Sequence, residues 1–429
     1  MMKAVKLMLV ITVILLSGRE PAVSQTTDTT VALPALINEA LENNPNLQSA
    51  MKSWMASKSR IPQAGALPDP IISFRVLNLP TNSLDFNQEA MTGKQIAFSQ
   101  NIPFPGKLGL KTRIAREGAQ MARARFAETR IQLIHQVKNA YYDLYLVDKT
   151  IATVKKNISA FQQFVKIAET KYSVGKGLQQ DVLRSQVELS KMMDRLIRAQ
   201  QKRETVAARI NALLNRPAGS SVGKPAELAF DSLSTSLDSL KALADKNRPL
   251  FEAWRARIRQ SQESVHLARK NYWPDFGFTL AYTQREPLLN GGKGYDFLSG
   301  IVNLKVPLYF WRKQKRKVEE TRSTFRSADD AFRDVRNRVY AKLDQSLSDL
   351  GKNARLLELF RTGIIPQASQ SLQSALVGYQ TDKIDFLTLI NNQINLFNFE
   401  LDYYRILSEY YKTIAALEAE TGVQLVPAK

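Results

Sequence analysis

The stretch Tyr172–Leu189, YSVGKGLQQDVLRSQVEL, decides the fold because it returns later in the chain as Tyr379–Leu396, YQTDKIDFLTLINNQINL. A shift of 207 positions aligns the tyrosines and the leucines at the ends of the two copies. Each copy lies between two long, polar-rich helical segments. An internal repeat constrains the architecture before any single element is assigned. The sequence therefore predicts a duplicated helix–turn–helix unit.

Composition places the chain among folded proteins. Of its 429 residues, 44% are hydrophobic and 23% are charged, and the 60 Lys and Arg residues exceed the 40 Asp and Glu residues by 20. Chains that stay disordered have fewer apolar residues for their charge. The absence of Cys excludes disulfide bonds, so stability must come from packing and assembly.

The first residues have the pattern of a secretory signal. Lys3 and Lys6 precede a short apolar run over 7–16, and Ala22-Val23-Ser24 fits a cleavage site. We expect residues 1–24 to be removed, and no Cys follows the apolar run to carry a lipid anchor. No other stretch approaches the length of about 18 uninterrupted apolar residues that a membrane helix needs.

Two similar units follow. The first is expected over 25–217 and the second over 237–422, with a Ser-, Gly- and Pro-rich linker at 218–236 and a tail at 423–429. Each unit contains two short helices, two strands, one very long helix and a returning helix. Alternating residues and flanking prolines predict strands at about 70–79, 94–103, 275–285 and 296–308. Apolar residues spaced by three and four predict long helices at about 108–172, 178–214, 311–379 and 386–420.

The long helices are expected to form extended coiled coils. A helix over 108–172 would be roughly 100 Å long at about 1.5 Å per residue, which exceeds ordinary globular helices. Its seam is interrupted by the polar residues Asp148, Lys155, Gln162 and Glu169. We expect a bend in the second long helix at Gly363 or Pro366.

The strands have the length of about nine to eleven residues that a tilted strand needs to cross a bilayer. Two hairpins cannot close a barrel, and an open edge is not tolerated in lipid. If these strands cross a membrane, several copies of the chain must share one barrel. The alternative is a soluble periplasmic coiled-coil scaffold or adaptor in which the hairpins form a small sheet facing water.

These features together resemble the TolC-type outer-membrane efflux proteins. The resemblance rests on the duplication, on Pro-Asp pairs at 68–69 and 274–275 before a strand, and on the pairs Ile102-Pro103 and Val306-Pro307 after one. It covers essentially the whole chain after the signal. The corners at 67–70 and 103–107 are most similar to the branch that serves heavy-metal cation pumps.

The resemblance implies the following architecture and setting. The fold would be mainly α with a small membrane β part, in which duplicated helical hairpins form an α-barrel. Four strands per chain would contribute to a 12-stranded β-barrel shared by a homotrimer. The protein would lie in the outer membrane with a long periplasmic extension and act as a passive conduit. A periplasmic adaptor and an inner-membrane pump of the RND type would dock at the helical tip.

The two turns are the expected docking site. The resemblance implies docking through residues Tyr172, Val174, Gly175, Lys176, Gly177, Leu178, Tyr379, Thr381 and Lys383. Asp382 and Asp385 would line the aperture, although Thr388 replaces the second acidic residue that the family often has. In the simpler alternative, the glycines only permit positive φ and the aspartates only favour a helix N-terminus.

A basic and aromatic cluster follows the last strand. Tyr309, Trp311, Arg312 and Lys313 are expected at the membrane interface, where aromatic and basic residues suit lipid headgroups. The same basic run also suggests a coiled-coil nucleic-acid binder, but an exported chain would not meet nucleic acid, so we expect none.

The sequence offers no catalytic or metal constellation. His135 and His266 are the only histidines, and two isolated histidines without Cys do not form a metal site. We expect no cofactor and no enzymatic activity. The cargo, whether metal cation, drug or polypeptide, is not determined by the sequence.

Overall fold

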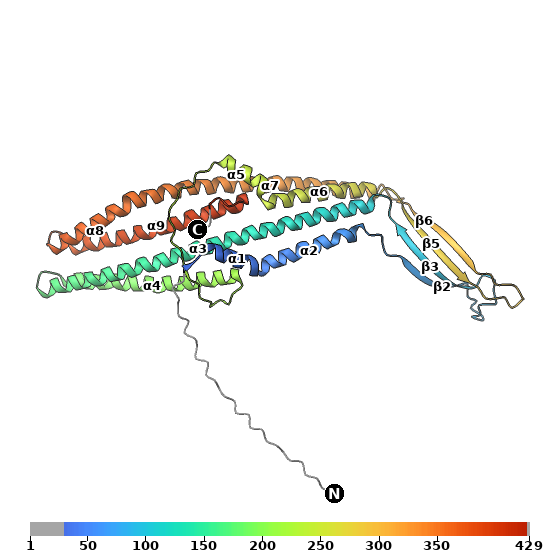
Figure 1. Ribbon diagram of the computed structural model, residues 1–429, viewed down its shortest axis with the longest axis horizontal. Coiled ribbons are helices and arrows are strands. Elements are labelled where there is room, and N and C mark those ends of the chain that lie inside the picture. The colour runs from blue at the N-terminus through green and yellow to red at the C-terminus, as the bar shows by residue number, and fades with distance from the viewer. Residues whose placement is uncertain (1–29, 427–429) are drawn as a thin grey trace, which may run out of the picture.

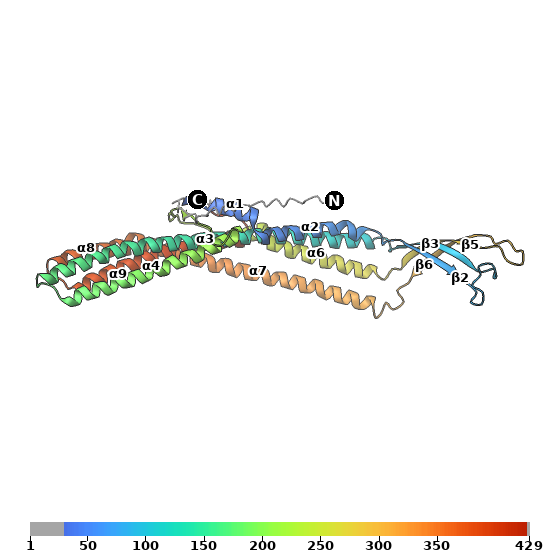
Figure 2. The same cartoon turned by 90° about the horizontal axis from the view of Figure 1, so that it is seen from below.

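The computed structural model describes residues 30–426 as an elongated molecule, with helices over most of its length and strands at one end (Figure 1; Figure 2). The expected signal at 1–24 and the end of the tail, 427–429, lie outside the described residues. The helices are α1 (Leu33–Asn43), α2 (Pro45–Gly65), α3 (Lys107–Ser173), α4 (Gln179–Leu214), α5 (Leu237–Asn247), α6 (Pro249–Lys270), α7 (Gln314–Leu359), the π-helical turn η1 (Phe360–Ile364), α8 (Ile365–Gln380) and α9 (Phe386–Thr421). The strands are β1 (Thr30–Val31), β2 (Ile71–Leu77), β3 (Gly93–Ile102), β4 (Lys224–Pro225), β5 (Asp275–Gln284) and β6 (Phe297–Lys305).

The order of elements repeats. Helices α1 and α2, strands β2 and β3, and helices α3 and α4 form one series, which α5, α6, β5, β6, α7–η1–α8 and α9 follow in the same order. In both halves a proline at the first position of the second helix, Pro45 or Pro249, separates the two short helices. The prediction of a mainly helical fold with a small sheet is confirmed.

The second long helix, expected over 311–379 with a bend at Gly363 or Pro366, is interrupted close to the expected bend. It starts at Gln314, and the π-helical turn η1 interrupts it before α8. Pro366 explains the interruption, since its ring removes one N–H donor and clashes with the preceding turn of an α-helix. The backbone N–H of Ile365 reaches back to the carbonyl of Phe360, five residues earlier, which widens the turn.

Two short strands were not expected. β1 pairs in parallel with β4, so that Thr30 lies beside Lys224 and Val31 beside Pro225. The sequence predicts a linker for the second of these stretches. The linker is further attached to the helices by hydrogen bonds: the Tyr410 hydroxyl donates to the carbonyl of Asp231 at 2.9 Å and accepts from the amide of Leu233 at 2.9 Å.

The four long strands form one antiparallel sheet in the order β2-β3-β5-β6. The central pair joins the two halves of the chain, with Ile96 opposite Tyr282 and Ser99 opposite Thr279. β6 ends at Lys305, three residues before the expected end at 308, because Pro307 cannot donate to a ladder. The outer edges of β2 and β6 have no partner strand within the described residues.

Two apolar cores lie along the helices. One is centred on α3 and α9 near the middle of the molecule, where α1 and α5 pack and Tyr141 and Tyr410 are fully buried. The other lies between the hairpins toward the end that is remote from the sheet, around Phe161, Leu389 and Phe397. The hairpins therefore pack against each other along most of their length, although helix α4 contacts almost only α3.

Ion pairs with buried members join the helices near the middle of the molecule. Lys138 of α3 pairs with Glu418 of α9, and Arg248 before α6 pairs with Glu420 of α9. Lys342 of α7 is 2.5 Å from the second oxygen of Glu420. Charges removed from water must be paired to be tolerated, so these contacts fix how α3, α6, α7 and α9 meet.

Candidate functional site

The two repeated turns lie together at the end of the molecule opposite the sheet. The α3–α4 turn and the α8–α9 turn form the left-hand end in both views (Figure 1; Figure 2). All the residues expected to dock a partner or line an aperture are thus near one another, although 207 positions separate the two copies in sequence. We call this end, residues 171–181 and 377–388, the tip.

The two turns share one backbone geometry. The amide of Lys176 donates to the carbonyl of Lys171 at 2.9 Å, and the amide of Lys383 donates to the carbonyl of Gly378 at 2.8 Å. These bonds span five residues and close a helix with a left-handed residue, which is Gly175 at φ 71° in the first turn.

Asp382 occupies the left-handed position of the second turn, at φ 59°. Asp tolerates this region better than most residues other than Gly and Asn. In the first turn Gly177 is required as well, because a Cβ there would lie 2.9 Å from the Cβ of Lys171. The glycines therefore have a structural reason to be present, whether or not they also dock a partner.

Lys171 joins the two turns, and it is not among the tip residues that the sequence predicts. Its Nζ atom lies 2.5 Å from a carboxylate oxygen of Asp382 and donates a hydrogen bond to the carbonyl of Tyr379. The same atom lies 4.3 Å from the centroid of the Tyr379 ring. No local pattern in the sequence marks this lysine, because its partners lie more than 200 residues away.

The two tyrosines that mark the repeat have different surroundings. Tyr172 is half exposed, and Val174 and Leu178 beside it are about two-thirds exposed. Tyr379 is buried and its ring centroid lies 5.1 Å from that of Phe386. Tyr379 therefore belongs to the packing between the hairpins, whereas the first turn presents an uncovered apolar surface.

The expected aperture aspartates both have local partners. Hydrogen bonding from Lys171 lowers the pKa of Asp382. Hydrogen bonding from Thr388 lowers the pKa of Asp385, which caps α9 by accepting from the Thr388 amide at 2.7 Å. A third carboxylate, Asp181 in the first turn of α4, has its pKa raised by burial and by the nearby charge of Asp385. The tip thus gathers three acidic residues, of which the sequence singled out two.

The residues expected at a membrane interface lie where the sheet meets the helices. Tyr309 and Trp311 are more than half exposed in the turn between β6 and α7, and their ring centroids are 6.2 Å apart. Arg312 and Lys313 follow directly, and their amides donate to the carbonyl of Tyr309 at 3.2 and 2.9 Å. The structure therefore places the aromatic and basic residues together at one level of the molecule.

Potential metal ligands do not cluster in the part of the chain that the structure describes. No group of three or more His, Cys, Asp or Glu residues there could hold a metal ion. Burial lowers the pKa of His135, whose Nε2 lies 3.0 Å from Asn139. His266 lies 3.6 Å from Glu263 on an exposed helix face. Within residues 30–426, no helix is long and apolar enough to cross a membrane.

Duplicated helical hairpins, with their turns at one end and a four-stranded sheet at the other, define the fold of the chain. The sequence profile of the outer membrane efflux protein family matches residues 36–216 and 240–423. The chain belongs to that family. The two matched segments correspond to the two copies of the repeat.

The sequences and structures of similar proteins are consistent with the family assignment. The chain is 20% identical to the cobalt-zinc-cadmium resistance protein CzcC of Cupriavidus metallidurans, over 91% of this chain and 90% of that protein. It is 21% identical to the toxin and drug export protein A of Aggregatibacter actinomycetemcomitans, over 66% and 65%. The crystal structure of the outer membrane protein VceC from Vibrio cholerae superposes with a TM-score of 0.77 at 17% identity, over 92% and 97%, and shows the same fold.

The chain is therefore an outer-membrane channel component of a tripartite efflux system. Its helices form the periplasmic extension, and it is not an enzyme. A periplasmic adaptor and an inner-membrane pump are its partners.

Proposed function

We propose that three copies of the chain form one channel, in which each copy contributes four strands to a closed 12-stranded barrel. The observation that carries this proposal is the sheet, which has two different faces. Directly opposed residues lie on the same face of an antiparallel sheet, so the register identifies both. One face is apolar apart from Lys94, Gln100 and Gln284, and consists mainly of Ile72, Phe74, Val76, Ile96, Phe98, Phe278, Leu280, Tyr282, Leu298, Val302 and Leu304.

The other face is mostly polar. It carries Ser73, Arg75, Gln95, Ser99, Asn101, Thr279, Thr283, Ser299, Asn303 and Lys305, together with a minority of apolar residues. Hydrogen bonds between side chains tie this face together, at 2.9 Å between Ser99 and Thr279 and at 3.0 Å between Gln95 and Thr283. An apolar outside and a polar inside are what a barrel in lipid requires.

The open edges support assembly. Among residues 30–426, no strand pairs with the outer edges of β2 and β6. Each backbone group left unpaired in lipid would cost on the order of several kcal/mol. Pairing β6 of one copy with β2 of the next satisfies both edges, and three copies close a ring. At the same level, Tyr309, Trp311, Arg312 and Lys313 suit the membrane interface.

Mass measurement tests the assembly. The full chain, extracted from outer membranes in a mild detergent, should give the protein mass of three chains by light scattering corrected for detergent. A monomer that is released from cells without detergent would refute the proposal and support a soluble scaffold. A dimer would keep the membrane barrel but refute the number of strands.

The tip is proposed to be both the docking surface and the gate. Tyr172, Val174 and Leu178 offer exposed apolar area beside Lys176 and Lys383 for an adaptor. Lys171 holds the second hairpin against the first through Tyr379 and Asp382, so breaking these contacts would let the hairpins separate.

A crosslink tests the gate. We suggest cysteines at 175 and 382 joined by a short bifunctional maleimide. Nothing lies within 4 Å of a Cβ built at Gly175, but its φ of 71° strains a cysteine there, so the cells with a single cysteine at 175 also control for that strain. Crosslinked cells should lose export, and cells carrying either single cysteine should keep it. Export that continues through fully crosslinked protein would refute the gate.

For cargo, we propose divalent metal cations, moved by a pump of the RND type. The support is the name of the cobalt-zinc-cadmium resistance protein, which is similar along nearly the whole chain. The second candidate, export of drugs or toxins, is favoured by the other relative, which covers less of the chain. A deletion strain that becomes sensitive to cobalt, zinc and cadmium but not to drugs supports the first; the opposite pattern supports the second.

A further inference from the structure

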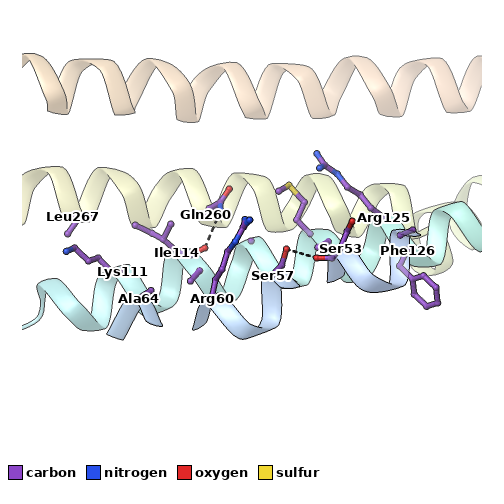
Figure 3. A pocket seen from close by; sticks show the side chains of 15 residues that line it. Ser53, Ser57, Arg60, Ala64, Lys111, Ile114, Arg125, Phe126, Gln260 and Leu267 are labelled. Atoms are coloured by element: carbon purple, nitrogen blue, oxygen red, sulfur yellow. Dashed lines mark hydrogen bonds between the residues drawn. The ribbon is translucent and has the colours of Figure 1, made fainter. Parts of the chain in front are cut away.

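A groove lies on α3 between α2 and α6, in the half of the helical region that is nearer the sheet (Figure 3). It has a volume of about 770 Å³, which is within the range of small-molecule sites. The groove is remote from the tip, and neither docking nor gating uses it.

All the charged side chains that line the groove are positive. Arg60, Lys111 and Arg125 line it, and the lining contains no carboxylate. Among residues 30–426, no ion pair is formed by any of these three cations. The acidic residues closest to these cations along α3, Glu117 and Glu128, lie outside the lining and are already paired with Arg259 and Arg248.

This imbalance extends beyond the groove. Helix α2 contains no acidic residue, and the segments 45–65 and 107–126 together carry nine Lys and Arg residues against Glu117 alone. Like charges at this density repel one another, which disfavours the folded protein unless anions approach. A surface of this kind attracts anions and repels free metal cations.

The floor of the groove is apolar. Ile114, Met121, Phe126 and Leu267 line it. In Figure 3, Leu267 lies beside Lys111 at one end of the groove and Phe126 lies at the other end. Small side chains on α2, such as Ala64, leave the groove open above this floor. A ligand that fits must therefore combine negative charge with an apolar body.

The groove is also long. Lys111 and Arg125 are fourteen positions apart on one helix, which corresponds to about 21 Å. Arg60 lies between them in Figure 3. A compact ion such as phosphate could not reach both ends. We propose that this groove binds an elongated amphipathic anion, with the chemistry of a long-chain carboxylate, whose head pairs with one of the three cations while its chain lies on the apolar floor.

Trp54 provides a local reporter. Its ring is stacked on that of Phe126, with the centroids 5.9 Å apart. A fatty acid brominated on its chain quenches nearby tryptophan fluorescence, so it serves as the probe. The full-length channel in nanodiscs should show a saturable quenching component that the Trp54→Phe variant lacks, above the linear quenching from probe dissolved in lipid.

Matched variants test the charges. Arg60→Gln, Lys111→Gln and Arg125→Gln together should weaken binding about tenfold, because each exposed charge contributes modestly. Lys52→Gln, Lys58→Gln and Arg116→Gln remove as many charges from the same region outside the lining and should change affinity less than twofold. The methyl ester of the probe, which has the same chain and no charge, should show no saturable component.

Three results would overturn the inference. Equal weakening in both triple variants would mean diffuse attraction to a basic surface rather than a site. Saturable binding of the ester would mean that the carboxylate is not recognised. If the groove variant alone fails to assemble into the wild-type oligomer, the groove is a contact between copies of the chain.

Discussion

Replacing Lys171 by Met should open the tip. The lysine donates to the carbonyl of Tyr379, and its ammonium group lies 4.3 Å from the centroid of that ring. A hydrogen bond from a charged donor contributes about 1.5–3 kcal/mol, and a cation over an aromatic ring about 0.5–1 kcal/mol. Met keeps most of the packing of the alkyl chain. Asp382 is exposed to water, which screens its charge, so its contact with Lys171 adds little to the free energy that holds the hairpins together.

The expected loss is therefore about 2 kcal/mol per subunit, which corresponds to about a thirtyfold shift of each hairpin toward the separated position. The assay is the conductance of single purified channels in planar bilayers, without adaptor or pump. The open probability of Lys171→Met should rise strongly above that of the wild type. Lys383→Met is the matched control, because this lysine lies on the neighbouring turn and forms no ion pair among residues 30–426. The reasoning is wrong if Lys171→Met assembles normally and conducts like the wild type, or if Lys383→Met opens the channel equally.

Three further predictions address the pH response, the sheet and the central ion pairs. Because hydrogen bonding lowers the pKa of Asp382, the contact with Lys171 is present above the ordinary carboxyl range and is lost only as pH falls through the lowered value. The pKa of Asp181 is raised, so the test uses an Asp181→Asn background; conductance there should stay constant from pH 7 to 5, and an increase in that window would contradict this. Leu280→Arg on the apolar face should cost about 2–4 kcal/mol and reduce folded protein in the outer membrane, whereas Thr279→Arg on the polar face should be tolerated; equal effects would reverse the assignment of the faces. Glu420→Gln leaves the buried Arg248 with only the more distant Glu128, at 3.4 Å, and should destabilise the chain by up to about 3–5 kcal/mol. The measurement is the thermal midpoint of unfolding, which should fall; an unchanged midpoint would show that these groups are hydrated.

The sequence by itself determined the helices, the turns and the duplication, because these depend on neighbours a few residues apart. The spacing of apolar residues indicated α3 and α4 to within about a residue at each end, since side chains at helical spacing must share one buried face. The prolines indicated where helices end, although the π-helical turn at Phe360–Ile364 replaced the simple bend that was expected.

The tertiary structure decided which distant residues meet. Lys171 reaches Tyr379 and Asp382, and β3 pairs with β5, across separations that no local pattern encodes. The two tyrosines of the repeat also show this limit: the sequence makes Tyr172 and Tyr379 equivalent, whereas packing leaves the first exposed and buries the second. Local periodicity fixes the shape of each element, but burial and pairing depend on the free energy of contacts between elements, which appears only when the hairpins lie side by side.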